Sequence, residues 1–175
     1  MVFARRLLQD IMCVPELSDS TVSLMDTDPE RLELMGKFAR KLAIDTGTNM
    51  TIEVTGDRRE ALAGSNYVLT TIRVGDSFER DIAIPLKYGV DQSVGDTVGP
   101  GGVFKALRTA PVLLDICDDI EDVAPDATLL NYTNPMAIAC WAIADGTDLP
   151  TLGLCHRVQH TTADLADYIG APRAS

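Results

Sequence analysis

Hydrophobic and polar residues follow two different periods along the chain. Between 3 and 12, apolar residues recur three and four positions apart, which predicts an amphipathic helix. Short apolar runs bounded by polar residues predict five strands, at 21–25, 51–55, 67–71, 128–131 and 151–154. Helices are predicted between and after them, at 29–44, 57–63, 99–123 and 136–144, with a further helix beginning at 162–169. The alternation predicts an α/β fold, a doubly wound parallel sheet with crossover helices.

One stretch, from Arg73 to Gly102, interrupts this alternation. It is rich in Gly, Asp and Pro, and only 85–89 suggests a turn of helix. Structureless connections longer than about 12 to 15 residues tend to be functional or mobile. We therefore expect this stretch to be functional or mobile rather than an idle connection.

Composition excludes several classes of partner. The chain has 175 residues, 46% of them hydrophobic, which is enough to bury a globular core. Acidic residues outnumber basic ones by 26 to 15, so a polyanion such as nucleic acid is a poor partner. No apolar run reaches the roughly 20 residues that cross a bilayer, and the first residues lack the order of a secretory signal. We expect a cytoplasmic protein that binds neither nucleic acid nor a membrane.

The four cysteines are scattered and form no CxxC pair, so disulfides are not indicated. Cys13, Cys117 and Cys140 lie in apolar, helix-like surroundings, where a free cysteine usually behaves as a small buried hydrophobe. Trp141 and its apolar neighbours are expected in the core. Only Cys155 invites a chemical interpretation, because a histidine follows it.

Cys155 and His156 come directly after the last predicted strand. A thiolate is a strong metal ligand and an imidazole transfers protons near neutral pH, so the pair can serve metal binding and acid-base chemistry. A buried cysteine beside a helix-capping histidine explains the same residues. A zinc site with His160 is a third alternative, although the ligands would be cramped and no fourth ligand is evident.

Asn131 and Asn134, in the sequence NYTNP, follow another predicted strand. Their amides both donate and accept hydrogen bonds, as recognition of a sugar or a nicotinamide requires. Asn-Pro is also an ordinary turn signal. Residues 128–162 thus bring polar groups to two strand ends, and ligands of parallel sheets gather at the carboxyl ends of the strands.

Two acidic residues have similarly divided interpretations. Asp26 ends the first predicted strand, where an acid accepts hydrogen bonds from the adenosine ribose in dinucleotide-binding sheets, yet Asp26 or Asp28 could simply cap the next helix. Asp96 precedes the glycines at the start of the helix at 99. It could support the site as an acid, or it could cap that helix. No glycine-rich loop precedes the first helix, and we expect the chain to begin after the place where that loop lies.

Five segments, taken together and in this order, resemble glycoside hydrolase family 4. They are DTDPERLEL, TTIRVG, KYGVDQSVGDTVGPGGVFKALRT, NYTNPMAI and GLCHRVQHT. The resemblance covers essentially the whole chain. It implies a Rossmann-like fold similar to lactate and malate dehydrogenases, with NAD+ and Mn2+ as cofactors.

The resemblance also implies a division of the chain and an incomplete sheet. Residues 1–160 correspond to the NAD-binding domain without its first strand, and 161–175 to the start of a truncated C-terminal catalytic domain. The missing strand is central, so its two neighbours should have unpaired edges. The second metal ligand, a histidine, and a tyrosine base lie beyond Ser175 in the family. The fragment alone is expected to be inactive and poorly stable, and the full-length enzyme to be a homo-oligomer.

The mechanism implied by the resemblance differs from the two-carboxylate scheme. NAD+ takes hydride from C3 of the sugar, the metal stabilises the keto group and enolate, and the tyrosine removes the C2 proton. The aglycone is eliminated, water adds, and hydride returns. Cys155 corresponds to the metal-binding cysteine, and His156 corresponds to the proton donor, which also contacts the substrate. Asn134 corresponds to a sugar-binding residue. Asp96 corresponds to an acid that raises the basicity of the tyrosine. The implied cofactor-binding residues are Asp26, Thr71, Ile72, Arg73 and Asn131.

The residue after the cysteine separates substrate classes in the family. Cys-His is similar to enzymes of unphosphorylated sugars, whereas Cys-Asp and Cys-Asn mark phospho-sugar enzymes. QSVGDT and CHxVQ are most similar to the α-galactosidase branch, although Arg157 replaces the usual small serine. The resemblance implies hydrolysis of small-molecule α-galactosides. Alternatives are an α-glucosidase or α-glucuronidase of the same family, and an NAD-dependent 2-hydroxy acid dehydrogenase.

Overall fold

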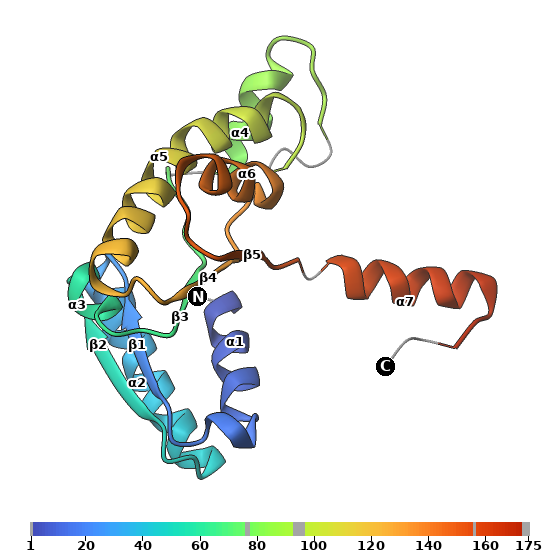
Figure 1. Cartoon of the computed structure of the whole chain (residues 1–175). Helices are drawn as coiled ribbons and strands as arrows, with labels where there is room; N and C mark the ends of the chain where they lie inside the picture. The colour runs from blue at the N-terminus through green and yellow to red at the C-terminus, as the bar shows by residue number, and fades with distance from the viewer. Residues whose placement is uncertain (1, 76–77, 93–96, 156, 173–175) are drawn as a thin grey trace.

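The chain folds into two parallel sheets surrounded by helices (Figure 1). The computed structural model describes residues 2–75, 78–92, 97–155 and 157–172. In chain order its elements are α1 (Val2–Met12), the 3-10 helix η1 (Pro15–Leu17), β1 (Thr21–Met25), α2 (Pro29–Thr46), β2 (Thr51–Thr55), α3 (Arg58–Leu62), β3 (Tyr67–Thr70), α4 (Phe78–Leu86), α5 (Gly99–Val123), β4 (Thr128–Asn131), α6 (Met136–Gly146), β5 (Thr151–Gly153) and α7 (Arg157–Ile169).

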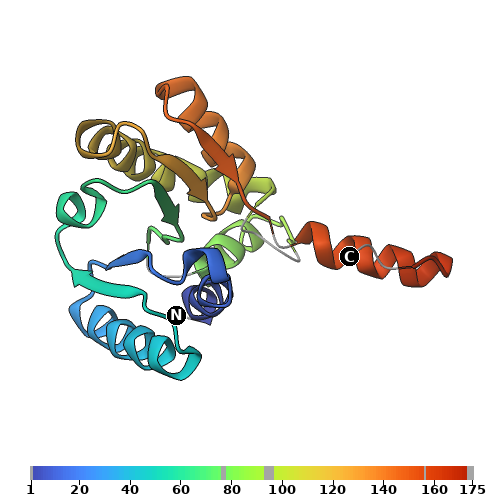
Figure 2. The same ribbon diagram turned by 60° about the horizontal axis from the view of Figure 1, so that its bottom comes forward.

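The strands form a doubly wound arrangement that is interrupted in the middle. β1 pairs with β2, and β3, β4 and β5 pair in that order, with every pairing parallel. Figure 2 shows the two sheets next to each other, with β1 on the side facing β3. Within the described parts of the chain, no ladder joins β1 to β3. The predicted fold class is confirmed, and the sheet is incomplete between these two strands.

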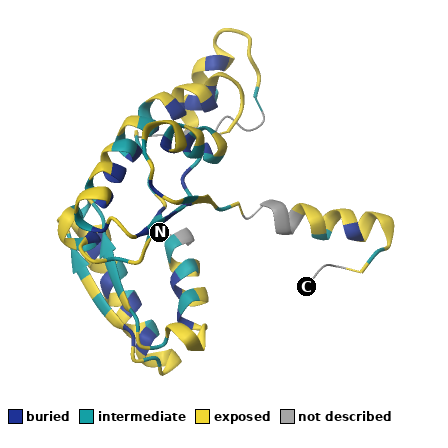
Figure 3. Ribbon diagram, viewed as in Figure 1, coloured by how far each residue is buried: buried dark blue, intermediate teal, exposed yellow. Residues whose placement is uncertain are grey.

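Each sheet has its own hydrophobic core, which Figure 3 shows as dark blue segments facing the strands. The smaller core joins α1 and α2 to the β1–β2 sheet. Its buried members are Leu8, Met12, Ala39, Ala43 and Met50. The larger core joins α5 and α6 to β4. Its buried members are Leu62, Leu113, Ile116, Cys117, Ile120, Ala124, Ala127, Leu129, Ala139, Ile143 and Leu149.

Local sequence signals explain where α2 begins and ends. Pro29 occupies its first turn, and the side chain of Asp28 accepts hydrogen bonds from the backbone N–H groups of Glu30 and Arg31, both at 3.1 Å. Gly47 ends the helix in the left-handed conformation, with φ of 70°. The helix therefore runs two residues further than predicted, to Thr46.

Helix α4 differs from the prediction of a single turn at 85–89. It begins at Phe78, and Pro85 lies inside it. Proline has no N–H, so the carbonyl of Asp81, four residues earlier, loses its helical partner. The side-chain amide of Gln92 donates to that carbonyl instead, at 3.3 Å. A distant residue thus compensates for the helix-breaking proline, which a local pattern does not reveal.

Helix α7 begins at Arg157 rather than at 162, and it extends away from both sheets in Figures 1 and 2. The predicted domain boundary at 160 therefore falls inside a helix, and the division itself stays a prediction. Among the described residues, no helix combines the length and apolar content needed to cross a membrane.

Two expectations about buried side chains are wrong. Trp141 is 76% exposed, because the buried residues of α6, Ala139 and Ile143, are one helical turn apart and Trp141 lies on the opposite face. Cys13 is exposed beyond the end of α1. Cys117 is fully buried, and burial raises the pKa of its thiol to about 11.

Candidate functional site

The predicted site residues of the larger sheet lie at one edge. Because β3, β4 and β5 are parallel, their carboxyl ends point the same way. Just past the strands, the N–H of Tyr132 donates to the carbonyl of Thr70 at 2.9 Å, and that of Leu154 donates to the carbonyl of Asn131 at 2.9 Å. This brings the segments at 71–73, 131–134 and 154–155 together.

Asn131 is buried beneath this edge, with no exposed surface. Its side-chain oxygen accepts hydrogen bonds from the Thr70 hydroxyl at 3.0 Å and from the Thr133 N–H at 3.1 Å. Its side-chain nitrogen donates to the Thr133 carbonyl at 3.2 Å and contacts the sulfur of Cys140 at 3.6 Å. The amide is satisfied inside the protein, so Asn131 shapes the turn that follows β4.

The turn after β4 also holds the segment after β3. The hydroxyl of Thr133, which is 2% exposed, accepts a hydrogen bond from the N–H of Ile72 at 3.0 Å. Ile72 is half-buried as a result, whereas Thr71 and Arg73 are exposed on either side of it. Of the predicted cofactor residues, Ile72 and Asn131 thus belong to one hydrogen-bonded unit with Thr133, while Thr71 and Arg73 flank Ile72 and Asp26 lies at the end of β1.

Asp26 and Asp28, the two acids after β1, make different hydrogen bonds in the structure. Asp28 caps α2, as described above. Asp26 does not cap the helix: one of its oxygens accepts from the N–H of Asp28 at 3.0 Å, and the other lies 3.9 Å from the guanidinium of Arg31. The Asp26 side chain is 33% exposed. A carboxylate oxygen therefore stays accessible at the end of β1.

A hollow of about 610 Å³ adjoins this carboxylate. It is bounded by the ends of β1 and β2 and by the first half of α2. Its lining residues are Asp26, Thr27, Pro29, Leu32, Glu33, Lys37, Arg40, Val54 and Gly56. The hollow therefore has an acid that can accept hydrogen bonds from hydroxyl groups, beside apolar and basic side chains.

Cys155 is exposed just past the end of β5. It directly follows Leu154, whose N–H donates to the carbonyl of Asn131 at 2.9 Å, so Cys155 comes at the strand end next to the NYTNP turn. Asn134 is half-buried in that turn and precedes the cis peptide bond to Pro135. Cys155 and Asn134 thus lie at the same edge of the sheet.

Close packing fixes the strand that ends before Cys155. A Cβ atom on Gly153 would lie 2.9 Å from the sulfur of Cys140 and 3.0 Å from that of Met136. A side chain at 153 would require the side chains of Cys140 and Met136 to shift. Gly153 is therefore a residue that supports the site, and its exposed position in a short strand gave no sign of this role.

Two predicted site residues, His156 and Asp96, lie outside the described residues. In the part of the chain that the structure describes, no three His, Cys, Asp or Glu side chains are grouped to hold a metal ion. Cys155 alone fits a metal by its chemistry, because a thiolate is a strong ligand. The described residues do not by themselves make a metal site.

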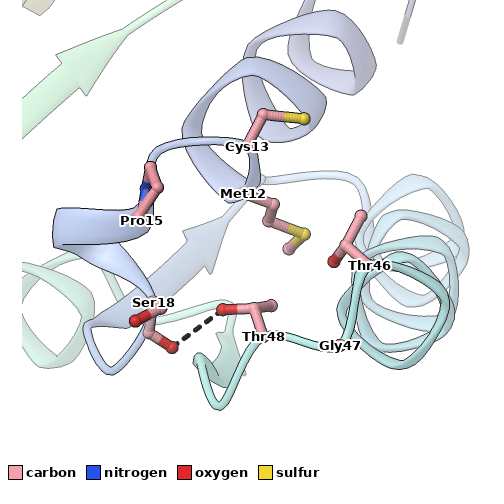
Figure 4. A pocket seen from close by; sticks show the side chains of 7 residues that line it. All are labelled: Met12, Cys13, Pro15, Ser18, Thr46, Gly47 and Thr48. Carbon is pink, nitrogen blue, oxygen red and sulfur yellow. Dashed lines mark hydrogen bonds between the residues drawn. The ribbon is translucent and has the colours of Figure 1, made fainter.

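A second hollow, of about 390 Å³, lies at the other end of the smaller sheet (Figure 4). Ser18 and Thr48 line it, and the hydroxyl of Thr48 donates to the Ser18 carbonyl at 2.8 Å. Both residues precede their strands, so this hollow faces the amino ends of β1 and β2. It is separate from the edge that carries the predicted chemistry.

The parallel strands and their crossover helices define a Rossmann-like α/β fold. The model of family 4 glycosyl hydrolases matches residues 1–171. The chain therefore belongs to glycosyl hydrolase family 4.

Curated relatives extend this result. The chain is 42% identical over 172 residues to an α-galactosidase of Rhizobium meliloti (strain 1021), a match that covers 97% of this chain and 35% of the relative. It is 41% identical over 172 residues to an α-galactosidase of Bacillus subtilis (strain 168), covering 97% of this chain and 40% of that protein. The chain thus spans well under half the length of these relatives.

Solved structures agree with the fold. The 6-phospho-beta glucosidase from Thermotoga maritima, solved with manganese, NAD+ and glucose-6-phosphate, is 26% identical with a TM-score of 0.79, over 96% of this chain and 41% of that chain. A malate dehydrogenase from Plasmodium falciparum has a TM-score of 0.67 at 12% identity, over 95% of this chain and 47% of that chain. The expected likeness to malate dehydrogenases is confirmed at the level of the fold.

Proposed function

We propose that this chain is the NAD+-binding part of an enzyme that hydrolyses α-galactosides with NAD+ and Mn2+. The observation that carries the proposal is the accessible carboxylate of Asp26 at the end of β1, in a chain of this family. An acid at this position accepts hydrogen bonds from ribose hydroxyls and repels a 2′-phosphate, so it favours NAD+ over NADP+. The two curated α-galactosidases support the choice of sugar.

The residues of the chain take distinct roles under this proposal. Asp26 binds the adenosine ribose, while Thr71, Ile72 and Arg73 line the cleft at the end of β3. Asn131 lies below that cleft and orients it, since its amide is occupied by Thr70 and Thr133. The bound NAD+ would supply a reversible hydride acceptor, which none of the twenty side chains provides.

The sugar side of the site lies at the ends of β4 and β5. Asn134 contacts the sugar hydroxyls, and Cys155 contributes one ligand to Mn2+. His156 acts as proton donor to the leaving group and contacts the substrate, while Asp96 supports the base. The second metal ligand and the tyrosine base belong to the longer protein. This part of the proposal rests on the family resemblance of the motifs.

The test uses the full-length enzyme that contains this chain and an aryl α-galactoside. Hydrolysis should require NAD+, Mn2+ and a reductant, and Cys155→Ser should abolish the metal-dependent rate while Cys13→Ser, at an exposed cysteine far from the edge, leaves it unchanged. Hydrolysis that persists after chelation and removal of the nucleotide would contradict the proposal. Steady accumulation of NADH would instead indicate a 2-hydroxy acid dehydrogenase.

A further inference from the structure

Arg108, in the first half of α5, contacts two other segments at once. Its Nε donates to the carbonyl of Val74 at 2.9 Å, in the segment after β3. Its two terminal nitrogens donate to the two carboxylate oxygens of Asp81 in α4, at 2.9 and 2.5 Å. The planar guanidinium is fully suited to this forked arrangement, which a lysine cannot reproduce.

Burial makes this ion pair important. The Asp81 side chain is only 8% exposed, and that of Arg108 is 33% exposed. Removal of one partner would leave a buried, uncompensated charge, which is strongly destabilising locally. The backbone passes close over the guanidinium as well: Gly75 has φ of 96°, and a Cβ atom there would lie 2.9 Å from the Arg108 Nε.

The contacts continue from Asp81 to the start of α5. The carbonyl of Asp81, left without a helical donor by Pro85, accepts from the side-chain nitrogen of Gln92. The side-chain oxygen of Gln92 accepts from the N–H of Gly101 at 3.4 Å. Arg108 therefore connects the segment after β3 with α4 and, through Gln92, with the first turn of α5.

The segment after β3 is fixed at two points. Thr133 holds the N–H of Ile72, and Arg108 holds the carbonyl of Val74. Arg73 lies between these two anchors, is exposed, and makes no hydrogen bond or ion pair with another described residue. A cation is thus presented at the strand end from a short backbone that is held on both sides.

We propose that Arg108 is a positioning residue for cofactor binding, which holds residues 71–75 against α4 so that Arg73 and its neighbours meet the nucleotide in one arrangement. The inference rests on the proposed function, because it assumes that the end of β3 faces the cofactor. It adds a residue that lies 35 positions beyond Arg73 and does not itself touch the nucleotide. Asp81 is its partner in this role.

The experiment compares Arg108→Met, Arg108→Lys and Arg58→Met in the full-length enzyme that contains this chain. Arg58 is the matched control: its side chain is 29% exposed, and it donates to Asp119 and Asp115 near the other end of α5. The two readouts are hydrogen exchange of the Ile72 amide, which donates to the Thr133 hydroxyl, and the dissociation constant for NADH. Unfolding midpoints are recorded for every variant.

Arg108→Met should speed exchange of the Ile72 amide by at least about tenfold, because loss of the Val74 anchor lets the segment open more often from Thr133. It should weaken NADH binding by about tenfold. Arg108→Lys keeps the charge and should recover part of the unfolding midpoint, but not the slow exchange. Arg58→Met should lower the midpoint without changing either readout.

Three results would overturn the inference. They are unchanged exchange of the Ile72 amide in Arg108→Met, equal acceleration in Arg58→Met, and faster exchange with unchanged affinity for NADH. Failure of the wild-type full-length enzyme to bind NADH at all would instead contradict the proposed cofactor role, on which the inference depends. The wild-type affinity and the effect of Arg108→Met therefore separate the two failures.

Discussion

At the residue scale, the sequence does not show which of two neighbouring acids, Asp26 or Asp28, caps helix α2. Asp26 and Asp28 flank the same turn, and either one could cap α2. In the structure Asp28 accepts from two backbone N–H groups, whereas Asp26 keeps one oxygen close only to Arg31, at 3.9 Å. Stability and nucleotide affinity should therefore depend on different residues.

Asp28→Ala should lower the free energy of unfolding by about 1 kcal/mol, because the first turn of α2 loses its cap. It should leave the affinity for NADH unchanged. Asp26→Asn should do the reverse, weakening NADH binding about tenfold through loss of a charged acceptor. Urea unfolding and a fluorescence titration of NADH check both variants. Equal effects of the two substitutions on affinity would contradict this division.

Cys117 gives a prediction for alkaline pH. Burial, followed by Glu121 and Asp118, raises the pKa of its thiol from the ordinary 9.0 to about 11. The unfolded chain therefore loses this proton first, so the contribution of Cys117 to stability is complete below about pH 9 and falls as pH rises towards about 11. Wild type should lose more stability across this range than Cys117→Ala, as urea unfolding can measure. An identical pH dependence in both would contradict the burial effect.

At the element scale, the sequence predicts those helices and strands whose bounds are set by nearby residues. The strands at 21–25 and 51–55 and the start of α2 at Pro29 agree with their predicted bounds, because short apolar runs and a capping acid specify them. The full length of α4 was not predictable, since Gln92 compensates for Pro85 from outside the helix. Trp141 was misplaced because α6 is apolar on several faces, so its period does not identify the buried one.

In the candidate site, too, some residue positions could be predicted from the sequence and others could not. Asp26 and Cys155 could be predicted because they follow strands in a parallel sheet, and that edge collects ligands. Arg108 and Asp81 could not, because an arginine and an aspartate 27 residues apart are ordinary in any sequence. Only the packing of α4 against α5 brings them together.

The start of α5 offers a test in which intrinsic helix propensity and packing disagree. Gly102→Ala would favour a helix by about 1 kcal/mol on propensity alone. A Cβ atom at Gly102 would, however, lie 2.6 Å from the backbone carbon of Thr97, so the preceding segment must move. We expect a net loss of about 1 to 3 kcal/mol in the free energy of unfolding. Gly56→Ala, whose added Cβ meets nothing within 4 Å, is the control and should be neutral; stabilisation by Gly102→Ala would refute the close contact.

At the scale of the whole molecule, the interrupted sheet separates two cores. The smaller core holds α1 and α2 on β1 and β2, and the larger one holds α5 and α6 on β4. No strand ladder joins the two sheets within the described residues, and α3 links them through the ion pairs of Arg58 with Asp115 and Asp119 of α5. Cooperative unfolding depends on contacts that link the parts of a domain, so cooperativity between these cores should be weaker than in a continuous sheet.

The isolated chain should therefore be poorly stable and unfold in transitions that do not coincide. Trp141 is the single tryptophan and lies on α6, next to the larger core, whereas far-ultraviolet circular dichroism reports helices of both cores. Urea titrations followed by the two probes should give different midpoints. Coincident, reversible and steep transitions of a soluble monomer would show that the two cores unfold as one unit.

We propose that the full-length enzyme cleaves α-galactosides through oxidation and elimination with NAD+. The most direct measurement is hydrolysis of an aryl α-galactoside in D2O with NAD+ and Mn2+. We expect turnover without net NADH formation and with deuterium at C2 of the released sugar, because the C2 proton is removed and replaced. Hydrolysis that leaves C2 free of deuterium and proceeds without NAD+ would contradict it.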